Sequence, residues 1–88
     1  MVDIRIILTE TLKEDYHRLP ERIQRKFTKQ LRFLAADPAH PSLQIHRLAD
    51  HWEFYVDLHY RCIFQQEGNV YILKHVGGHE IVDRFGKH

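Results

Sequence analysis

The sequence predicts a single α+β domain with the element order β-α-α-β-β-β-β. Three observations support this prediction: a β-branched run near the N-terminus, apolar residues at helical spacing in the first half, and alternating side chains in the second half. Helices followed by a run of short strands are typical of the α+β class, in which the helices pack on one face of a sheet.

Residues 3–8 contain the run IRII and are predicted to form the first strand, because β-branched side chains favour extended backbone. Thr9 is a suitable N-cap for the helix that follows. Pro20 interrupts this helix and fits the first turn of a second helix, which Asp37 and Pro38 end. The two helices are expected to form an antiparallel hairpin. Their apolar stripes are Leu12, Tyr16 and Leu19, and then Ile23, Phe27, Leu31 and Leu34.

After a loop at residues 38–42, four strands are predicted at residues 43–48, 52–57, 60–65 and 70–76. The segments between them are short and rich in turn-forming residues, so the strands are expected to form an antiparallel meander. A glycine pair, Gly77 and Gly78, ends the last strand, and residues 79–88 are expected to be a short tail.

Residues 52–64 alternate between two kinds of side chain, which predicts one apolar and one reactive face. We expect the apolar set to face the helices: Trp52, Phe54, Val56, Leu58, Tyr60, Cys62 and Phe64. The other set would face outward, into a concavity if the sheet twists: Glu53, Tyr55, Asp57, His59, Arg61 and Ile63. Carboxylate, imidazole and guanidinium groups move protons and hold phosphates, so this outward face is the predicted site.

Length and composition indicate one folded domain over residues 1–88, since 43% of the residues are hydrophobic and nothing suggests disorder. No apolar stretch is long enough to span a membrane, and the N-terminal segment lacks the pattern of a secretory signal. The single cysteine, Cys62, lies within a predicted strand. A buried, reduced thiol and a cytoplasmic location are therefore expected.

The formal net charge is only +1, but cations concentrate between His17 and Arg32. This window contains Arg18, Arg22, Arg25, Lys26, Lys29 and Arg32, against the single acid Glu21. A basic helix face suits an acidic protein segment or a nucleic acid backbone, and a solvated helix face explains it equally well. The eight histidines show no metal-binding spacing on a helix and accompany one cysteine, so no metal site is predicted.

Two residues are candidates on chemical grounds alone. Arg61 could clamp a phosphate with its planar guanidinium, or it could form an ion pair with Glu53 or Asp57 across the hairpin. His79 directly follows the glycine pair, where a histidine is well placed for acid–base chemistry, although it could also be a loop histidine without a role. Other residues would join this set only if the strands pair as predicted: His46, Tyr55, Asp57 and His59.

The string WEFYVDLHYRCIF at residues 52–64, followed by VYILKHVGGH at residues 70–79, resembles the RelE/ParE superfamily of bacterial toxin–antitoxin systems. The shared features are Trp52, the aromatic–arginine pair before an apolar run, and His79 after the glycines. The segment His46–Leu48 also fits. The predicted element order matches the RelE-like fold, so the resemblance covers nearly the whole chain. It implies a toxin that cleaves mRNA in the ribosomal decoding site and is neutralised by an antitoxin peptide.

The resemblance further implies a metal-independent endoribonuclease without a cofactor. Glu53 and Tyr55 stand where one branch has lysines, so the chain looks closer to the branch that uses histidine and aspartate. The implied catalytic residues are His46, Asp57, Arg61 and His79, with the two histidines as acid and base, the aspartate orienting, and the arginine on the scissile phosphate. The implied substrate-binding residues are Tyr55, His59, Phe85, Arg22, Arg25, Lys26 and Lys29. The implied partners are a cognate antitoxin in a hetero-oligomer, mRNA and the ribosome.

Two alternatives stay open. The ParE branch has the same fold, but it inhibits DNA gyrase and lacks the catalytic histidines. The other alternative is a degenerate module that keeps only antitoxin binding, because the terminal tyrosine common in the superfamily is absent and Phe85 is the only candidate aromatic in its place.

Overall fold

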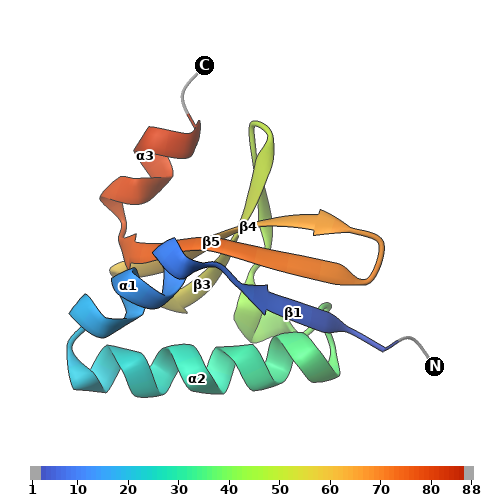
Figure 1. Cartoon of the computed structure of the whole chain (residues 1–88), viewed down its shortest axis with the longest axis horizontal. Coiled ribbons are helices and arrows are strands. Elements are labelled where there is room, and N and C mark those ends of the chain that lie inside the picture. The colour runs from blue at the N-terminus through green and yellow to red at the C-terminus, as the bar shows by residue number, and fades with distance from the viewer. Residues whose placement is uncertain (1–2, 87–88) are drawn as a thin grey trace.

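Five strands form one mixed sheet with the spatial order β1-β5-β4-β3-β2 in a computed structural model that describes residues 3–86 (Figure 1). The α+β class and the element order through the last strand are as predicted. In chain order the elements are β1 (Arg5–Leu8), α1 (Glu10–Arg18), α2 (Glu21–Ala36), a 3₁₀ turn (Pro41–Leu43), β2 (His46–Leu48), β3 (His51–Asp57), β4 (Tyr60–Glu67), β5 (Val70–Gly78) and α3 (Glu80–Gly86).

The strands β2 to β5 form the predicted antiparallel meander. The first strand, β1, joins the other edge of the sheet and runs parallel to β5, with Arg5 opposite Val70 and Leu8 opposite Leu73. A parallel neighbour requires a long crossover connection, and here α1, α2 and the first three strands of the meander supply it.

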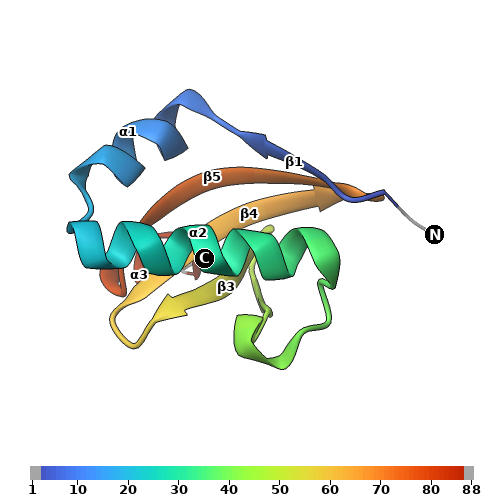
Figure 2. The ribbon, with the colours of Figure 1, turned by 90° about the horizontal axis from the view of Figure 1, so that it is seen from below.

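Thr9 is the N-cap of helix α1, as predicted, and its hydroxyl oxygen accepts a hydrogen bond from the amide of Leu12. The same hydroxyl donates to the carbonyl of Leu73 at 2.8 Å, so the cap also ties the start of α1 to β5. The chain reverses at Pro20 and continues as α2. Seen from below, α2 crosses the strands while α1 lies beside β5 (Figure 2).

The hydrophobic core lies between these two helices and the sheet. Phe27 of α2 is stacked on Phe54 of β3, with ring centroids 6.2 Å apart, and Phe54 contacts Phe64 of β4 at 5.9 Å. Leu12, Ile23 and Leu34, taken from the predicted helical stripes, are also buried in this cluster. The predicted apolar faces are therefore confirmed for the helices and for most of the strand pair.

The predicted strand at residues 43–48 is shorter in the structure. Pro41–Leu43 forms a 3₁₀ turn, and Gln44 adopts a left-handed conformation with φ of 44°, so extended backbone begins only at His46. Leu43 is the last residue of this turn, and its side chain is buried in the core. Apolar character at this position reflected burial and not strand geometry.

The expected tail contains a helix instead. Helix α3 packs on the face of the sheet opposite α2 (Figure 1), where it contacts β5, β4 and β2. Ile81 and Phe85 are four residues apart and so lie on one side of the helix, which gives it an apolar side for the sheet. A helix of seven residues is too short to stand out by periodicity, because its stability comes from tertiary packing.

Leu58 was predicted on the apolar face, but it is 68% exposed in the turn between β3 and β4. The pairing of these strands shifts register between Tyr55 and Asp57, so the alternation does not continue to the end of β3. Cys62 is buried as expected, and burial raises the pKa of its thiol well above the usual range.

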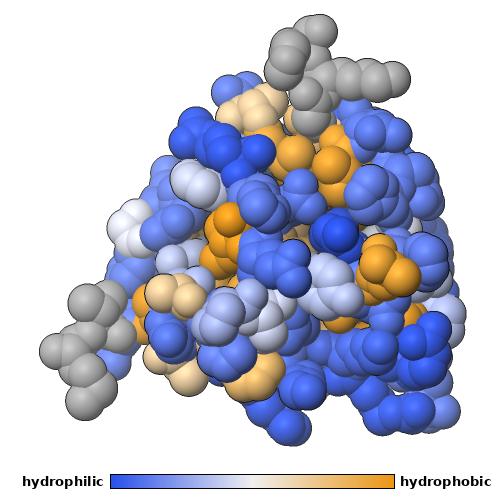
Figure 3. Space-filling view, turned by 180° about the vertical axis from the view of Figure 1, so that it is seen from behind, coloured by the Kyte–Doolittle hydropathy of each residue, from blue (hydrophilic) through white to orange (hydrophobic). Residues whose placement is uncertain are grey.

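Most of the surface seen from behind is hydrophilic, and the hydrophobic residues that show through are in small, separate groups (Figure 3). Among residues 3–86, no helix has both the length and the apolar character needed to cross a membrane. The cytoplasmic location stays a prediction.

The Phe27–Phe54 contact should dominate the stability of the domain. Replacing Phe54 by alanine removes a fully buried ring and leaves a cavity between α2 and the sheet, which should lower the free energy of unfolding by about 3–5 kcal/mol. Urea denaturation of Phe54→Ala beside Leu58→Ala measures this, because the exposed Leu58 should change stability by less than about 0.5 kcal/mol. Equal losses for the two variants would contradict the placement of the core.

Candidate active site

One row of side chains crosses the sheet on the face opposite α2. His46 of β2 is paired with Glu53 of β3, Glu53 with Ile63 of β4, and Ile63 with His75 of β5. Directly paired residues project to the same side of a sheet. The row therefore places a histidine near each end, with an acid and an apolar residue between them.

Arg61 lies in the adjacent row, between Tyr55 and Gly77. Its Nε donates to the Oε1 of Glu53 at 3.3 Å, and its guanidinium stacks over the ring of Tyr55 at 4.9 Å. Its Nη1 also donates to the carbonyl of Asp57 at 2.7 Å. The ion pair that the sequence left open is thus formed with Glu53, and it holds Arg61 in one orientation.

The Arg61–Glu53 pair is shielded from water, since the side chains are only 18% and 10% exposed. A charge pair in such a place is costly to break, because the remaining partner would be buried without compensation. Within residues 3–86, the contacts of Arg61 use its Nε and Nη1 atoms and leave Nη2 for a ligand. A guanidinium oriented in this way is suited to meet an oxyanion.

Helix α3 covers part of this face. Ile81 lies against Gly77, where a side-chain Cβ would meet the Cγ2 atom of Ile81 at 3.3 Å. Phe85 packs on His51 and His75, with ring centroids 5.1 and 4.9 Å apart. The expected outward concavity is therefore partly covered, and Phe85 lies on the polar face.

His79 lies at the corner where β5 ends and α3 begins. Its amide donates to the carbonyl of His59, in the β3–β4 turn, at 2.8 Å, and both side chains are exposed. Arg61 is near this corner because Gly77, its pairing partner, is two residues before His79. The structure thus brings His59, Arg61 and His79 to one end of the face.

His46 is not at that corner. It is exposed on the edge strand β2, and β3 and β4 separate it from β5. Neighbouring strands are about 4.8 Å apart, so roughly 14 Å of sheet lies between β2 and β5. The predicted pairing of His46 with His79 across one phosphate is not supported by this arrangement.

Asp57 is on the other side of the sheet from Arg61, contrary to the predicted outward set. The register shift after Tyr55 turns its carboxylate toward α2, where its Oδ2 accepts from Lys26 at 2.6 Å and from Arg22 at 3.4 Å. The hydrogen bond from Lys26 is the largest cause that lowers the pKa of Asp57 to about 2, and the amide of His59 adds to it.

The predicted nucleic-acid contacts on α2 are partly used within the protein. Arg22 and Lys26 pair with Asp57, and Arg25 pairs with Glu21 at 3.5 Å. Lys29 lies 5.9 Å from the ring of Phe33. Since α2 packs on the core side of the sheet, these cations lie on the other side from His46, while Arg22 and Lys26 reach the β3–β4 turn through Asp57.

Three residues near the site were not predicted from the sequence: Asp15, His51 and His75. His51 and His75 contact Phe85, and Asp15 of α1 accepts hydrogen bonds from His75 and from the amide of Val76. The pairing of His75 with the row of His46 could have been found from the strand register. Nothing local marks Asp15, because its partners are 60 residues away. Among residues 3–86, no group of three or more histidine, cysteine, aspartate or glutamate side chains is arranged to hold a metal ion.

Solved structures of toxins share this architecture. YafQ from Escherichia coli strain BL21(DE3) has a TM-score of 0.73 and 13% identity, over 90% of this chain and 97% of YafQ. The chain has the RelE-like fold. The RelB–RelE antitoxin–toxin complex from Methanococcus jannaschii gives a TM-score of 0.73 at 15% identity, over 90% of this chain and 98% of the other. The DinJ–YafQ toxin–antitoxin complex from E. coli gives 0.74 at 12%, over 91% and 97%.

No protein-family model matches the sequence, and no curated protein matches it either. At 12–15% identity, the shared structure shows a common fold and does not assign roles to individual site residues.

Asp57 should make the protein sensitive to acid. Its pKa is below the unfolded value of about 3.9, so its contribution to stability is complete above that value and is lost as the pH falls toward 2. Asp57→Asn should flatten the pH dependence of the urea midpoint between pH 4 and 2, removing up to about 2 kcal/mol of acid sensitivity. Lys26→Met should flatten it partly, since Arg22 stays. An unchanged slope in Asp57→Asn would contradict the ion pair.

Proposed function

We propose that the protein is the toxin of a toxin–antitoxin pair and acts as a metal-independent endoribonuclease on mRNA. The observation that carries this proposal is the corner at the ends of β4 and β5, where His59, Arg61 and His79 come together on a RelE-like fold. Two histidines whose backbones are hydrogen-bonded, near the strand position of Arg61, supply the kinds of group that this cleavage needs.

In the proposed reaction, the ribose 2′-hydroxyl attacks the adjacent phosphorus and the bond to the 5′-oxygen breaks. One neutral imidazole takes the 2′ proton, and one protonated imidazole gives a proton to the leaving oxygen. We assign His79 to one of these roles, and the backbone contact between His79 and His59 favours His59 as the other. The Nη2 of Arg61 faces the charge that develops on the phosphate.

The remaining predicted residues take supporting roles in this proposal. His46 is too far across the sheet to share the scissile phosphate, so it would contact a neighbouring part of the RNA. Tyr55 is covered by Arg61, and Phe85 is accessible beside His75, which makes Phe85 the better base-stacking candidate. Asp57 would act indirectly, by fixing the β3–β4 turn through the amide of His59.

An antitoxin segment would dock on the opposite side of the molecule. An apolar groove of about 280 Å³ lies between α1 and α2, with Leu12, Tyr16 and Phe27 in its lining and Lys13 and His17 at its edge. Ile7 and Leu8 of the edge strand β1 are exposed beside it. Apolar residues with basic neighbours suit an amphipathic, acidic segment. The mRNA and ribosome of the proposal would meet the other face.

The catalytic assignment is tested at His79. Expression of the wild-type chain should arrest growth and cleave mRNA, and His79→Ala should lower the cleavage rate by about 10²–10⁴-fold, because an acid or base in the reaction is lost. Primer extension on cellular mRNA measures the cleavage. His40→Asn is a matched control, since His40 is far from the corner and asparagine can still accept from Ser42.

Equal cleavage by wild type and His79→Ala would refute the assignment. Growth arrest without mRNA cleavage, accompanied by loss of gyrase supercoiling activity in vitro, would replace the proposal with the ParE alternative. An inert wild-type protein that still binds an antitoxin would identify the degenerate module.

A further inference from the structure

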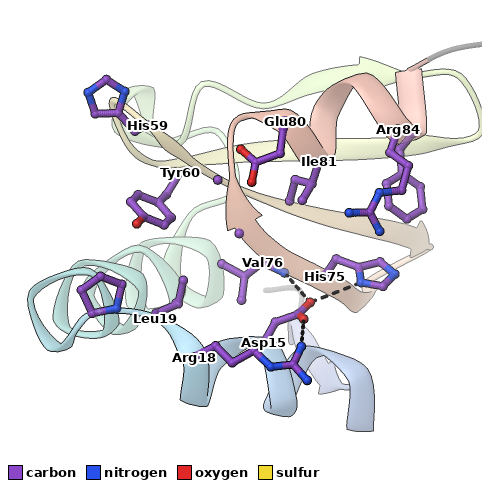
Figure 4. Close-up of a pocket in the computed structure, with 14 residues that line it drawn as sticks. Asp15, Arg18, Leu19, His59, Tyr60, His75, Val76, Glu80, Ile81 and Arg84 are labelled. Atoms are coloured by element: carbon purple, nitrogen blue, oxygen red, sulfur yellow. Dashed lines mark hydrogen bonds and ion pairs between the residues drawn. The ribbon is translucent and has the colours of Figure 1, made fainter.

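A cleft of about 480 Å³ lies between α1, the end of β5 and α3 (Figure 4). His59 of the proposed active corner is one of its lining residues. Asp15 and Arg18 come from α1, and Glu80 and Arg84 come from α3. The cleft therefore continues the active corner between two helices, and it includes His75, at the β5 end of the row that begins with His46.

Asp15 organises one wall of the cleft. Its Oδ2 accepts from the Nδ1 of His75 at 3.2 Å and from the amide of Val76 at 3.3 Å, while its Oδ1 is 3.8 Å from the Nη1 of Arg18. A carboxylate on Nδ1 fixes the orientation of an imidazole and leaves Nε2 as the atom that a ligand can contact. An ionised carboxylate can only accept a hydrogen bond, so the proton in this contact is assigned to Nδ1 of His75.

Arg84 approaches His75 from the other wall, and Figure 4 shows its guanidinium directed toward the imidazole. Among residues 3–86, Arg84 is exposed and forms no ion pair, while the side chain of Arg18 is 77% exposed and only loosely paired with Asp15. Two guanidinium groups on either side of an oriented imidazole form a suitable site for a phosphate group.

Two aromatic rings line the same cleft. Tyr60 is half-buried near His59, and Phe85 lies against His75. Flat rings beside a phosphate site are the usual means of holding an unstacked base. An acidic peptide would pair with the arginines but would leave the aromatic rings without a stacking partner. Arginines together with aromatic rings therefore favour a nucleotide over an acidic peptide. The lining contains two acids. Asp15 is paired with Arg18, whereas Glu80 has no ion-pair partner among residues 3–86 and would repel an anion.

We propose that this cleft is a second RNA subsite, which binds one phosphate and its adjoining base in single-stranded RNA next to the scissile bond. Arg18, His75 and Arg84 hold the phosphate, and Tyr60 or Phe85 stacks on the base. The subsite rests on the proposed ribonuclease function, because it extends the path of the same RNA strand away from the corner.

Binding of a fluorescent 2′-O-methyl RNA oligonucleotide tests the subsite, because this RNA lacks the attacking hydroxyl and stays intact. Fluorescence anisotropy should give a dissociation constant about 3–10-fold higher for Arg84→Gln and for Arg18→Gln than for wild type. Glu80→Gln should bind more tightly, since it removes an opposing carboxylate. Arg5→Gln is the matched control, because Arg5 is an exposed arginine on β1, away from the cleft.

Equal affinities for the Arg18, Arg84 and Arg5 variants would overturn the subsite, even if wild-type protein cleaves mRNA normally. Arginine-dependent binding in a protein that cleaves no mRNA would support the subsite and refute only the ribonuclease. Displacement of the oligonucleotide by equimolar inorganic phosphate would reduce the site to a simple anion site, and displacement by an equimolar polyglutamate peptide would assign it to a protein partner. Either displacement overturns the RNA proposal.

Discussion

The stacking of Phe27 on Phe54 is the contact on which the rest of the structure depends. It fixes α2 against the sheet and so decides which face of the strands is buried by the long helices. Because side chains alternate along a strand, placing Phe54 inward sends Glu53 and Tyr55 to the other face. The inward orientation of Phe54 therefore also fixes the face on which the paired residues of the other strands lie. These are His46, Glu53, Ile63 and His75, with Arg61 in the adjacent row.

Two charged side chains, Glu53 and Arg61, are largely buried on the polar face, which helix α3 partly covers. Helix α3 brings Ile81 and Phe85 onto it, and burial under this cover is tolerable because Glu53 and Arg61 neutralise each other. The same pairing orients the guanidinium toward the corner. The covered and open parts of the face thus have different roles: the centre is held rigid by the ion pair, and the exposed histidines gather where α3 begins.

The two charged regions of the molecule serve different surfaces. The cations of α2 lie on the core side of the sheet, and Arg22 and Lys26 fix the β3–β4 turn through Asp57. The corner lies at the ends of β4 and β5, and the cleft beside it lies between α1 and α3, so that Arg61, Arg18 and Arg84 come from three separate elements. The apolar groove and the cleft are both lined by α1 but by different residues, Leu12 and Tyr16 in the groove and Asp15 and Arg18 in the cleft.

The sequence by itself determined the fold class, the two long helices with their ends, the antiparallel meander and most of the core, because these follow from local periodicity, capping and turns. It also identified Arg61 and His79 as candidate site residues, and the strand register then showed that they lie near one another. Only the tertiary structure decided that Asp57 faces α2, that residues 80–86 form a helix, and that Asp15 holds His75. A register shift of one residue, a helix stabilised only by packing, and a contact across 60 residues leave no periodic signal in the chain.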